Sequence, residues 1–420
     1  MQPRSLLIVF GGRSSEHQVS LRSAEEVLAA VDRERFTPRL LGIDRAGTWH
    51  QGDADMVPSE VVARGLPITD LHQLRADVAF PLLHGPWGED GTFQGLLETI
   101  GIPYVGSGVL ASALCMDKAQ SKHILAAHDI PQVPWFRCGR GEVSERRACE
   151  ALGDRAEREL GYPVFVKPAN QGSSVGIGRA ECREQLLHAL ATAARYDEVV
   201  VVERGVRARE IEVAVLGNSD TARGGRGRLI SAPGEIGLPE GIWYDYAAKY
   251  ENDVARLHIP AGLSPQTTSR IRSLAERAFL ACGCSGLARV DFLVERENEN
   301  GIYLNEINTM PGFTTVSMYP KLIQHAGVAY TDLIVQLCDL AMARHASRGA
   351  NLNTPDTRGT PDRLRNEGCD PEPSRAAAVR ATSGSRPERG PTAEPEPEPE
   401  PTAEPEPTAE PEPTAELEPE

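Results

Sequence analysis

The feature that most constrains the fold of this chain is an apolar run that leads directly into glycine and then into a helix. Residues Ser5–Phe10 are almost all apolar, which is typical of a parallel strand covered on both faces. The run enters Gly11-Gly12, and apolar residues then recur at helical spacing from Leu21 to Val31. A second apolar run, Val78–Leu83, again precedes a glycine-rich loop and a short helix. Two such units predict a doubly wound α/β domain over residues 1–108.

Polar residues follow both of these predicted strands. Glu16 comes after the first strand, and His84-Gly-Pro-Trp-Gly-Glu-Asp-Gly91 comes after the second. Ligands of doubly wound domains lie at the carboxyl ends of the strands, so these residues fall on the functional rim. A helix-entry charge at Glu16 and a strand-end hydrogen bond at His84 are the alternatives that need no ligand.

The pattern changes after Val109, where strands no longer alternate simply with helices. A small α+β domain is predicted over 109–202, from a helix that runs to about Ala127, strands Val164–Ala169 and Val175–Arg179, a helix near Arg183–Ala194 and strand Val199–Glu203. A larger α+β domain is predicted over 203–346, from strands Ile211–Leu216, Leu287–Val294 and Ile302–Ile307 and helices near Ser269–Cys282 and Thr331–Ala343. The chain is therefore expected to hold three folded domains.

The end of the chain has a different composition. Residues 391–420 contain eleven glutamates and ten prolines but no lysine or arginine. Such a segment cannot bury enough apolar surface to offset its chain entropy, and residues 347–390 also lack hydrophobic periodicity. We therefore expect residues 347–420 to be a disordered low-complexity tail. Without these eleven glutamates the formal charge of −16 falls to −5.

Several classes of protein are disfavoured by what the sequence lacks. Basic clusters that would indicate a nucleic-acid partner are missing. No apolar run reaches the roughly 18 residues that a membrane-spanning helix needs, and the N-terminus lacks the features of a signal peptide. The eight cysteines are scattered, with only Cys282 and Cys284 close together. Reduced thiols in a soluble, cytoplasmic protein are the simplest interpretation.

A glycine- and serine-rich loop joins two strands of the predicted central domain. Residues 170–178, Asn-Gln-Gly-Ser-Ser-Val-Gly-Ile-Gly, offer backbone N–H groups and hydroxyls without bulk, which suits phosphate oxygens. Lys167 precedes the loop and supplies a point charge for phosphate. The loop does not match the Walker pattern, and Gly11-Gly12 lacks the third glycine of a dinucleotide fingerprint. An ordinary hairpin is the alternative.

Two late strands carry candidate metal ligands. Alternation places Arg289 and Asp291 on one face of Leu287–Val294, and Glu306 and Asn308 on one face of the next strand, together with Leu304. If the strands pair as a hairpin, the side chains of Asp291, Glu306 and Asn308 converge as three oxygen ligands. Such ligands suit Mg²⁺ or Mn²⁺ that carries nucleotide phosphates. A solvated polar face is the alternative.

At this point the chain resembles the D-alanine–D-alanine ligases of the ATP-grasp superfamily, from Leu6 to about Ala343. The motifs that carry the resemblance are Gly11-Gly-Arg-Ser-Ser-Glu-His-Gln-Val-Ser20, His84–Gly95, Tyr104–Gly108, Met116-Asp-Lys118, Val166-Lys-Pro168, Gly172–Gly176, Tyr244-Asp-Tyr-Ala-Ala-Lys-Tyr250, Gly286–Asp291 and Asn305–Thr314. The resemblance implies a three-domain ATP-grasp fold and a homodimer. The tail has no counterpart in the family pattern.

The resemblance also implies a role for each candidate residue at the nucleotide site. Lys118 and Lys167 would hold the phosphates of ATP, beneath the loop that carries Ser173 and Ser174. Glu203 and the backbone from Arg204 to Val206 would bind adenine, Glu210 the ribose, and Lys249 the γ-phosphate. Asp291, Glu306 and Asn308 would bind two Mg²⁺ or Mn²⁺ ions.

The remaining roles concern the two D-alanine molecules. Glu16, aided by His84, would bind the ammonium of the first, and Ser317 with the backbone of Met318 would bind the carboxylate of the second. Arg289 and the Gly312 N–H would stabilise the oxyanion. Glu16, Ser173 and Tyr250 would form a hydrogen-bonded set.

The implied reaction forms D-alanyl-D-alanine for peptidoglycan synthesis through an acyl phosphate, with release of ADP and phosphate. A ligase that uses D-lactate or D-serine as acceptor is the nearest alternative, and Tyr250 favours an amine acceptor. An ATP-grasp ligase of another substrate would lack the Glu16 and His84 motifs. A non-catalytic nucleotide-binding protein with an acidic interaction tail would be expected to have broken metal ligands, and these are intact.

Overall fold

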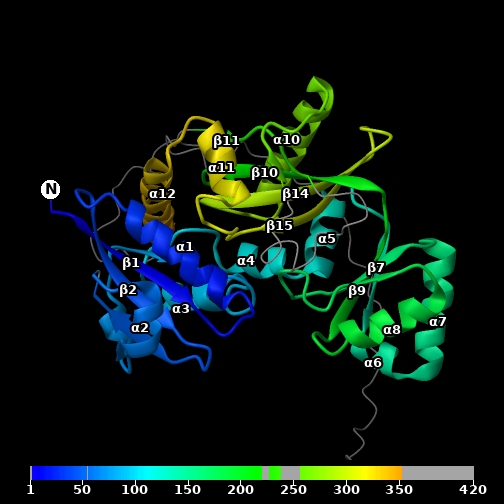
Figure 1. The fold of residues 1–420 in the computed structure, drawn as a ribbon, viewed down its shortest axis with the longest axis horizontal. Helices are drawn as coiled ribbons and strands as arrows, with labels where there is room; N and C mark the ends of the chain where they lie inside the picture. The colour runs from blue at the N-terminus through cyan, green and yellow to red at the C-terminus, as the bar shows by residue number, and fades with distance from the viewer. Residues whose placement is uncertain (1, 54, 220–226, 238–255, 352–420) are drawn as a thin grey trace, which may run out of the picture. The chain divides into compact units, whose positions relative to one another are not determined.

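A computed structural model describes residues 2–53, 55–219, 227–237 and 256–351. Three separate sheets, each with its own helices, account for these residues (Figure 1). The predicted residues Lys249 and Tyr250 and most of the predicted tail lie outside the described ranges. No single helix in those ranges is long and apolar enough to cross a membrane, although one bent pair of late helices reaches that length and composition when joined.

The first sheet has the order β4-β3-β2-β1-β5. β1 pairs in parallel with β2 and β5, while the short strands at the other edge are antiparallel. Its elements are β1 (Arg4–Gly11), α1 (His17–Ala30), β2 (Phe36–Ile43), β3 (Trp49–Gly52), α2 (Pro58–Arg64), β4 (Leu66–Pro67), η1 (Leu71–Leu74), β5 (Val78–Pro81) and α3 (Thr92–Thr99). Both predicted strands are confirmed, and the antiparallel edge makes the sheet mixed.

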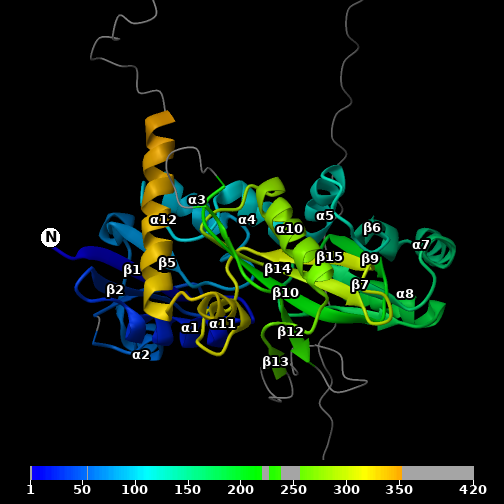
Figure 2. The same ribbon diagram turned by 90° about the horizontal axis from the view of Figure 1, so that it is seen from above.

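Helices cover both faces of this sheet because β1 is apolar on both sides. Ile8 packs into one core with residues of α1, whereas Val9 packs into a second core with residues of α3. The last described helix, α12 (Tyr330–Asn351), lies beside α1 (Figures 1 and 2). It contributes Leu337 to the first of these cores. The C-terminal end of the folded chain is thereby packed on its first sheet.

The second sheet, of order β6-β9-β7-β8, is antiparallel. Its elements are β6 (Trp135–Gly139), α6 (Arg140–Ser144), α7 (Arg146–Glu159), β7 (Val164–Pro168), β8 (Gly178–Ala180), α8 (Arg183–Ala193) and β9 (Val199–Arg204). The predicted strands are confirmed, except that β8 begins only at Gly178. Glu203, at the predicted start of the third domain, lies within β9 of this sheet.

The third sheet has the antiparallel order β13-β12-β10-β14-β15, with β11 paired to β10. Its elements are β10 (Ala208–Leu216), β11 (Leu229–Ile230), β12 (Gly234–Gly237), β13 (Arg256–His258), α10 (Pro265–Ala281), β14 (Leu287–Glu295), β15 (Ile302–Asn308) and α11 (Met318–His325). Val213 and Val290 face a core that α10 completes. The opposite side of β14 and β15 carries the polar residues.

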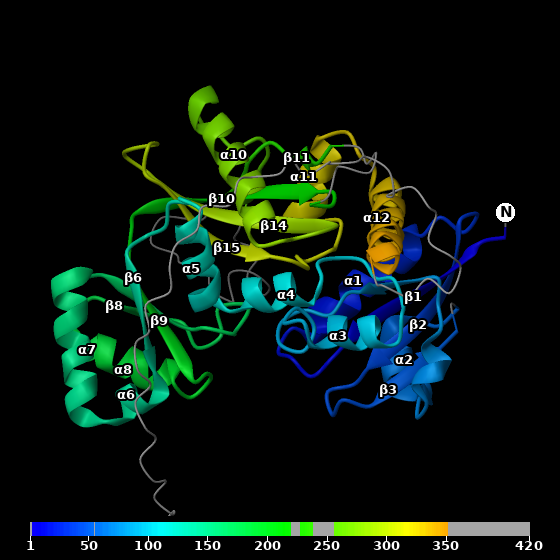
Figure 3. The ribbon, with the colours of Figure 1, turned by 180° about the vertical axis from the view of Figure 1, so that it is seen from behind.

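The helix predicted from Val109 to about Ala127 is two helices, α4 (Val109–Met116) and α5 (Lys118–Ala127). Asp117 between them is extended, and its carboxylate caps α5 by accepting from the N–H groups of Ala119 and Gln120. Both helices contribute to the core of the third sheet, and α4 lies against β15 (Figure 3). Helix α5 also packs on the second sheet, where its Ala119 contacts a small cluster with Ala169 and Val201.

Two further differences from the sequence-based expectation concern the end of the third domain and the cysteines. Helix α12 continues past residue 346, the predicted end of the body, because Arg348 pairs with Glu98 and Arg344 Nη2 donates to the Tyr104 carbonyl (3.2 Å). The fold also brings Cys115 to Cys284, with 3.7 Å between their sulfur atoms. Within the described ranges every cysteine is a free thiol.

Candidate active site

The polar face of the third sheet aligns three carboxylates in one row. Glu212 on β10 lies directly opposite Asp291 on β14, and Asp291 lies opposite Glu306 on β15. In the next row Arg289 lies opposite Asn308. The hairpin predicted from the sequence is therefore confirmed, and it places the three candidate metal ligands together.

The prediction that Leu304 shares this face is wrong, because β15 has a bulge. The register shifts between Asp291 and Phe292, so that Leu304 pairs with Phe292 and Asn305 has no partner of its own. Leu304 consequently lies in the core, while Glu306 lies on the polar side. Bulges redirect side chains in this way and are frequent beside active sites.

Asp291 is held by charged and polar neighbours. Its carboxylate accepts from Arg289 Nε (2.8 Å), Arg289 Nη2 (2.7 Å) and Asn308 Nδ2 (2.9 Å). Glu212 Oε2 lies 3.0 Å from the same Arg289 Nε. Burial would lower the pKa of Arg289, but the charges of Asp291 and Glu212 raise it well above its ordinary value. Glu212 is absent from the sequence-based site, although its alternation with the apolar Ile211 and Val213 was a usable signal.

The chemistry of this set fits a divalent cation that arrives with a nucleotide. In the described part of the chain no three His, Cys, Asp or Glu side chains form a metal cage by themselves. The candidate set instead offers two carboxylates and one amide oxygen. Mg²⁺ is commonly held by one or two carboxylates and completed by substrate phosphates and water, so an incomplete protein cage is the expected form.

Two lysines of the predicted phosphate site reach the polar face from other elements. Lys167, at the end of β7, donates to Asn305 Oδ1 (3.2 Å), the residue that the bulge turns toward it. Lys118, the first residue of α5, donates to the Gln171 carbonyl (2.7 Å) and lies 3.8 Å from Glu306. The second and third sheets therefore meet at these side chains.

Glu203 lies between two ammonium groups. Its Oε2 is 2.6 Å from Lys167 Nζ, and its Oε1 is 2.9 Å from Nζ of Lys122, a buried residue of α5. Burial alone would raise the pKa of Glu203, but the two lysines lower it to about 2. Burial would also lower the pKa of Lys167, which Glu203 instead raises above its ordinary value. Lys122 was not predicted as a site residue.

The glycine-rich loop contacts the first domain through Ser173. The Ser173 hydroxyl donates to Glu16, and Ser173 and Ser174 both have positive φ angles (47° and 61°), which are rare for residues other than glycine. Glu16 is the N-cap residue of α1, yet its side chain makes no capping bond. The alternative role of a simple helix-entry charge is therefore not what this geometry shows.

His84 is an internal hydrogen-bonding residue in this structure. Its Nδ1 lies 3.1 Å from the Met310 carbonyl and 3.7 Å from Glu89, and its Nε2 lies 3.2 Å from Ser23 Oγ. Burial alone would lower the pKa of His84, but Glu89, Glu16 and the carbonyl raise it. Burial raises the pKa of Glu89 in turn. The strand-end hydrogen bond proposed as the alternative for His84 is thus present.

Ser317 and its neighbours form a turn before α11. Ser317 occupies the N-cap position without a capping bond, and its hydroxyl lies 2.7 Å from Thr314 Oγ1. A side chain at Gly312 would approach Ser317 Oγ to 3.2 Å, so glycine keeps this turn compact. Met318 begins α11 and is buried.

The remaining predicted nucleotide residues lie where the second sheet passes into the third. Arg204 ends β9 and donates its backbone N–H to Pro134 (2.9 Å). Val206 follows in the connection, and Glu210 lies on β10, opposite Ile236 and Leu293.

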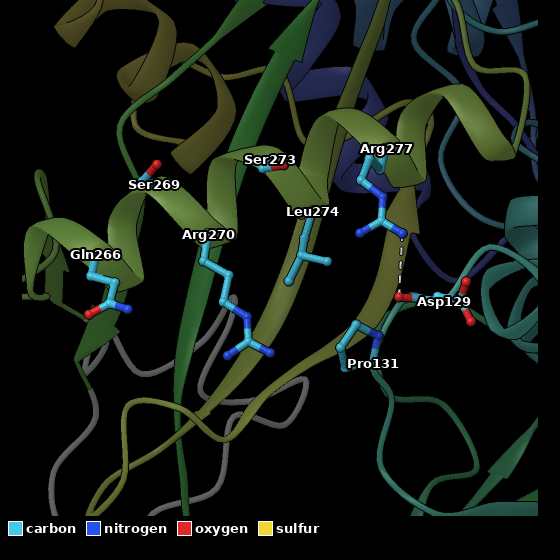
Figure 4. Close-up of a pocket in the computed structure, with 8 residues that line it drawn as sticks. All are labelled: Asp129, Pro131, Gln266, Ser269, Arg270, Ser273, Leu274 and Arg277. Carbon is cyan, nitrogen blue, oxygen red and sulfur yellow. Dashed lines mark hydrogen bonds between the residues drawn. The ribbon is translucent and has the colours of Figure 1, made fainter.

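A surface hollow of about 490 Å³ lies apart from these residues, between α10 and the turn at Asp129 (Figure 4). Arg270 and Arg277 line it, and Arg277 Nη2 donates to the His128 carbonyl (2.6 Å). None of the predicted site residues that the structure describes lines this hollow.

Comparison with known proteins identifies the family. A model described as "D-ala D-ala ligase N-terminus" matches residues 5–107, and one described as "D-ala D-ala ligase C-terminus" matches residues 124–339. The D-alanine–D-alanine ligase of Heliobacterium modesticaldum is 44% identical over 371 residues, which cover 84% of this chain and 98% of that protein.

Solved structures agree with this assignment. The D-alanine–D-alanine ligase of Coxiella burnetii has 34% identity and a TM-score of 0.71, covering 84% of this chain and 97% of its own. The VanG D-Ala:D-Ser ligase of Enterococcus faecalis has 32% identity and a TM-score of 0.70, covering 81% and 100%. The fold is thus a mixed α/β fold shared with ligases, and the chain belongs to the D-alanine–D-alanine ligase family.

Proposed function

We propose that the protein joins two molecules of D-alanine into D-alanyl-D-alanine at the expense of ATP. The observation that carries the proposal is the meeting of all three sheets at polar side chains: Ser173 with Glu16, and Lys167 with Asn305. A three-domain ATP-grasp enzyme needs this convergence, because it must hold a nucleotide and two amino acids at one point.

In the first step, a carboxylate oxygen of the first D-alanine attacks the γ-phosphorus of ATP, and ADP leaves. Lys118 and Lys167 neutralise phosphate charge under the loop of Ser173 and Ser174, while Glu203, Arg204, Val206 and Glu210 bind the nucleoside. Phosphoryl transfer of this kind depends mainly on position and charge neutralisation. Lys249 is assigned to the γ-phosphate, although it lies outside the described residues.

Asp291, Glu306 and Asn308 would hold two Mg²⁺ or Mn²⁺ ions against the phosphates. These ions supply charge neutralisation when bound. Arg289 would remain between Glu212 and Asp291 and orient the Asp291 carboxylate for such a cation.

In the second step, the amine of the second D-alanine attacks the acyl carbon of the D-alanyl phosphate, and phosphate leaves. Arg289 and the Gly312 N–H would stabilise the oxyanion, an effect typically about 3–4 kcal/mol per donor. Glu16, with His84, would hold the first ammonium, and Ser317 with Met318 the second carboxylate. Tyr250, outside the described residues, would complete the set with Glu16 and Ser173 and favour an amine acceptor.

We propose that the reaction takes place in the cytoplasm, in the synthesis of peptidoglycan precursors, and that the assembly is a homodimer. The direct test is phosphate release from ATP with D-alanine alone, then with added D-serine or D-lactate, followed by product analysis. We expect the D-alanyl-D-alanine dipeptide to dominate. A product that contains mainly D-serine or D-lactate would transfer the assignment to that ligase class, and no D-alanine-dependent phosphate release would refute it.

A further inference from the structure

Lys122 is a fully buried charge for which the proposed reaction has no use. The residue is 1% exposed, and its Nζ lies 2.9 Å from Glu203 Oε1 and 5.8 Å from the centre of the Trp135 ring. The backbone carbonyl of Lys122 accepts a hydrogen bond from Gln132 Nε2 (2.9 Å), which links α5 to the segment that follows it. The ammonium group of Lys122 therefore contacts Glu203 of β9 inside the protein.

A buried ammonium group is costly, and packing alone does not explain it. Removing a charge of this size from water costs several kcal/mol per ion, and a hydrophobic residue of similar volume often stabilises a protein more than a buried ion pair does. Burial also lowers the pKa of Lys122, because the loss of water disfavours the charged form of the ammonium group. A lysine at this position therefore points to a requirement of its partner, Glu203.

Among the described residues, Glu203 forms ion pairs with two lysines, and only one of them also reaches the polar face where the nucleotide would bind. Lys167 is bonded to Oε2 and also reaches Asn305 at the polar face. Lys122 forms an ion pair with Oε1 from the buried side, and its side chain is 2% exposed. When Lys167 turns to a phosphate, Glu203 keeps Lys122 and its Oε2 becomes available.

We propose that Lys122 is a positioning residue for base selection: it fixes Oε1 of Glu203, so that Oε2 accepts a hydrogen bond from the 6-amino group of adenine. This inference rests on the proposed function, because it takes Glu203 as the adenine-binding residue. A carboxylate accepts from an amino group but repels a carbonyl oxygen at the same position. The Lys122–Glu203 pair therefore selects adenine over hypoxanthine, which carries a carbonyl there.

The second consequence concerns Lys167. Without Lys122, the carboxylate of Glu203 has Lys167 as its remaining cationic partner among the contacts described above, and the two ions hold each other more tightly. Lys167 then leaves Glu203 for a phosphate less readily. Loss of Lys122 should weaken nucleotide binding and reduce base discrimination together.

The test compares binding of ADP and IDP, with Mg²⁺, to the full-length protein by isothermal titration calorimetry. The wild type should bind ADP at least tenfold more tightly than IDP. In Lys122→Met this ratio should fall to about threefold or less, with ADP affinity at least tenfold weaker. Lys122→Arg, which retains a cation, should recover most of the ratio. Because the ratio is measured within one sample, it does not depend on the fraction of protein that is folded.

A matched control is Arg228→Met. Like Lys122, Arg228 is a cation held by a carboxylate, Glu276 at 2.9 Å, but Arg228 is only partly buried and the pair lies outside the candidate site. This variant should lose stability and keep the wild-type ADP/IDP ratio. A wild type without preference for ADP, or a Lys122→Met protein that keeps its ratio within twofold, would overturn the inference. Binding needs no D-alanine, so failure of the ligase assay is a separate result.

Discussion

Replacement of Asp291 by alanine separates the catalytic role of this residue from its structural role. The substitution removes three hydrogen bonds, two from Arg289 and one from Asn308. Hydrogen bonds to charged groups contribute about 1.5–3 kcal/mol each, so the three bonds together contribute at most roughly 4.5–9 kcal/mol. Breaking a buried pair typically costs about 3–5 kcal/mol when a charge is left uncompensated.

Arg289 is not left uncompensated, because Glu212 remains 3.0 Å from its Nε. We therefore expect Asp291→Ala to lower the free energy of unfolding by about 2–4 kcal/mol, below the limit set by those three bonds. Typical proteins have about 5–15 kcal/mol, so the variant should stay folded. Turnover should nevertheless be abolished, because the cation loses a carboxylate ligand that no neighbour replaces.

Urea denaturation and phosphate release measure the two effects on the same samples. Asp291→Asn keeps an oxygen that accepts from Arg289, so it should recover about half of the lost stability and none of the activity. Asp154→Ala is the matched control: it breaks an exposed bond to Arg183 (2.7 Å) and should cost at most about 1 kcal/mol. Near-normal turnover of Asp291→Ala at saturating Mg²⁺ would refute the metal assignment, and a loss above about 5 kcal/mol would refute the role given to Glu212.

Three further predictions follow from other parts of the chain. Tyr250→Phe should slow dipeptide formation several-fold. With equimolar D-alanine and D-lactate at neutral pH, the wild type should form mainly the dipeptide, and an excess of D-alanyl-D-lactate would contradict the amine preference assigned to Tyr250. Glu203→Gln should lower the free energy of unfolding at neutral pH. Because folding lowers the pKa of Glu203 to about 2, the stability advantage of the wild type over this variant should disappear as the pH falls from about 4.5 to about 2. Urea titrations of both proteins at several pH values test this, and an advantage that grows toward low pH would contradict it. Removal of residues 352–420 should leave turnover and stability unchanged, whereas removal from residue 346 onward should cost stability through Arg348; a several-fold loss of turnover in the shorter truncation would show that the tail has a structural role.

Local pattern in the sequence determined the strands and the chemistry of the candidate ligands. The apolar run Ser5–Phe10 predicted β1, and the alternation around Arg289 and Asp291 predicted a two-sided strand, because side-chain direction in a strand follows directly from position. The motifs also placed Glu16, His84 and the loop of Ser173 in one family of enzymes. These features depend on neighbours in the chain, which the sequence shows.

Only the tertiary structure decided how distant segments combine. The bulge at Asn305 arises from pairing between two strands, so period-2 alternation placed Leu304 on the wrong face. Lys122 and Glu212 were missed for the same reason: each owes its importance to a charged partner on another element, Glu203 or Arg289. A buried charge is tolerated only where folding brings it an opposite one, and no local pattern of residues contains that partner.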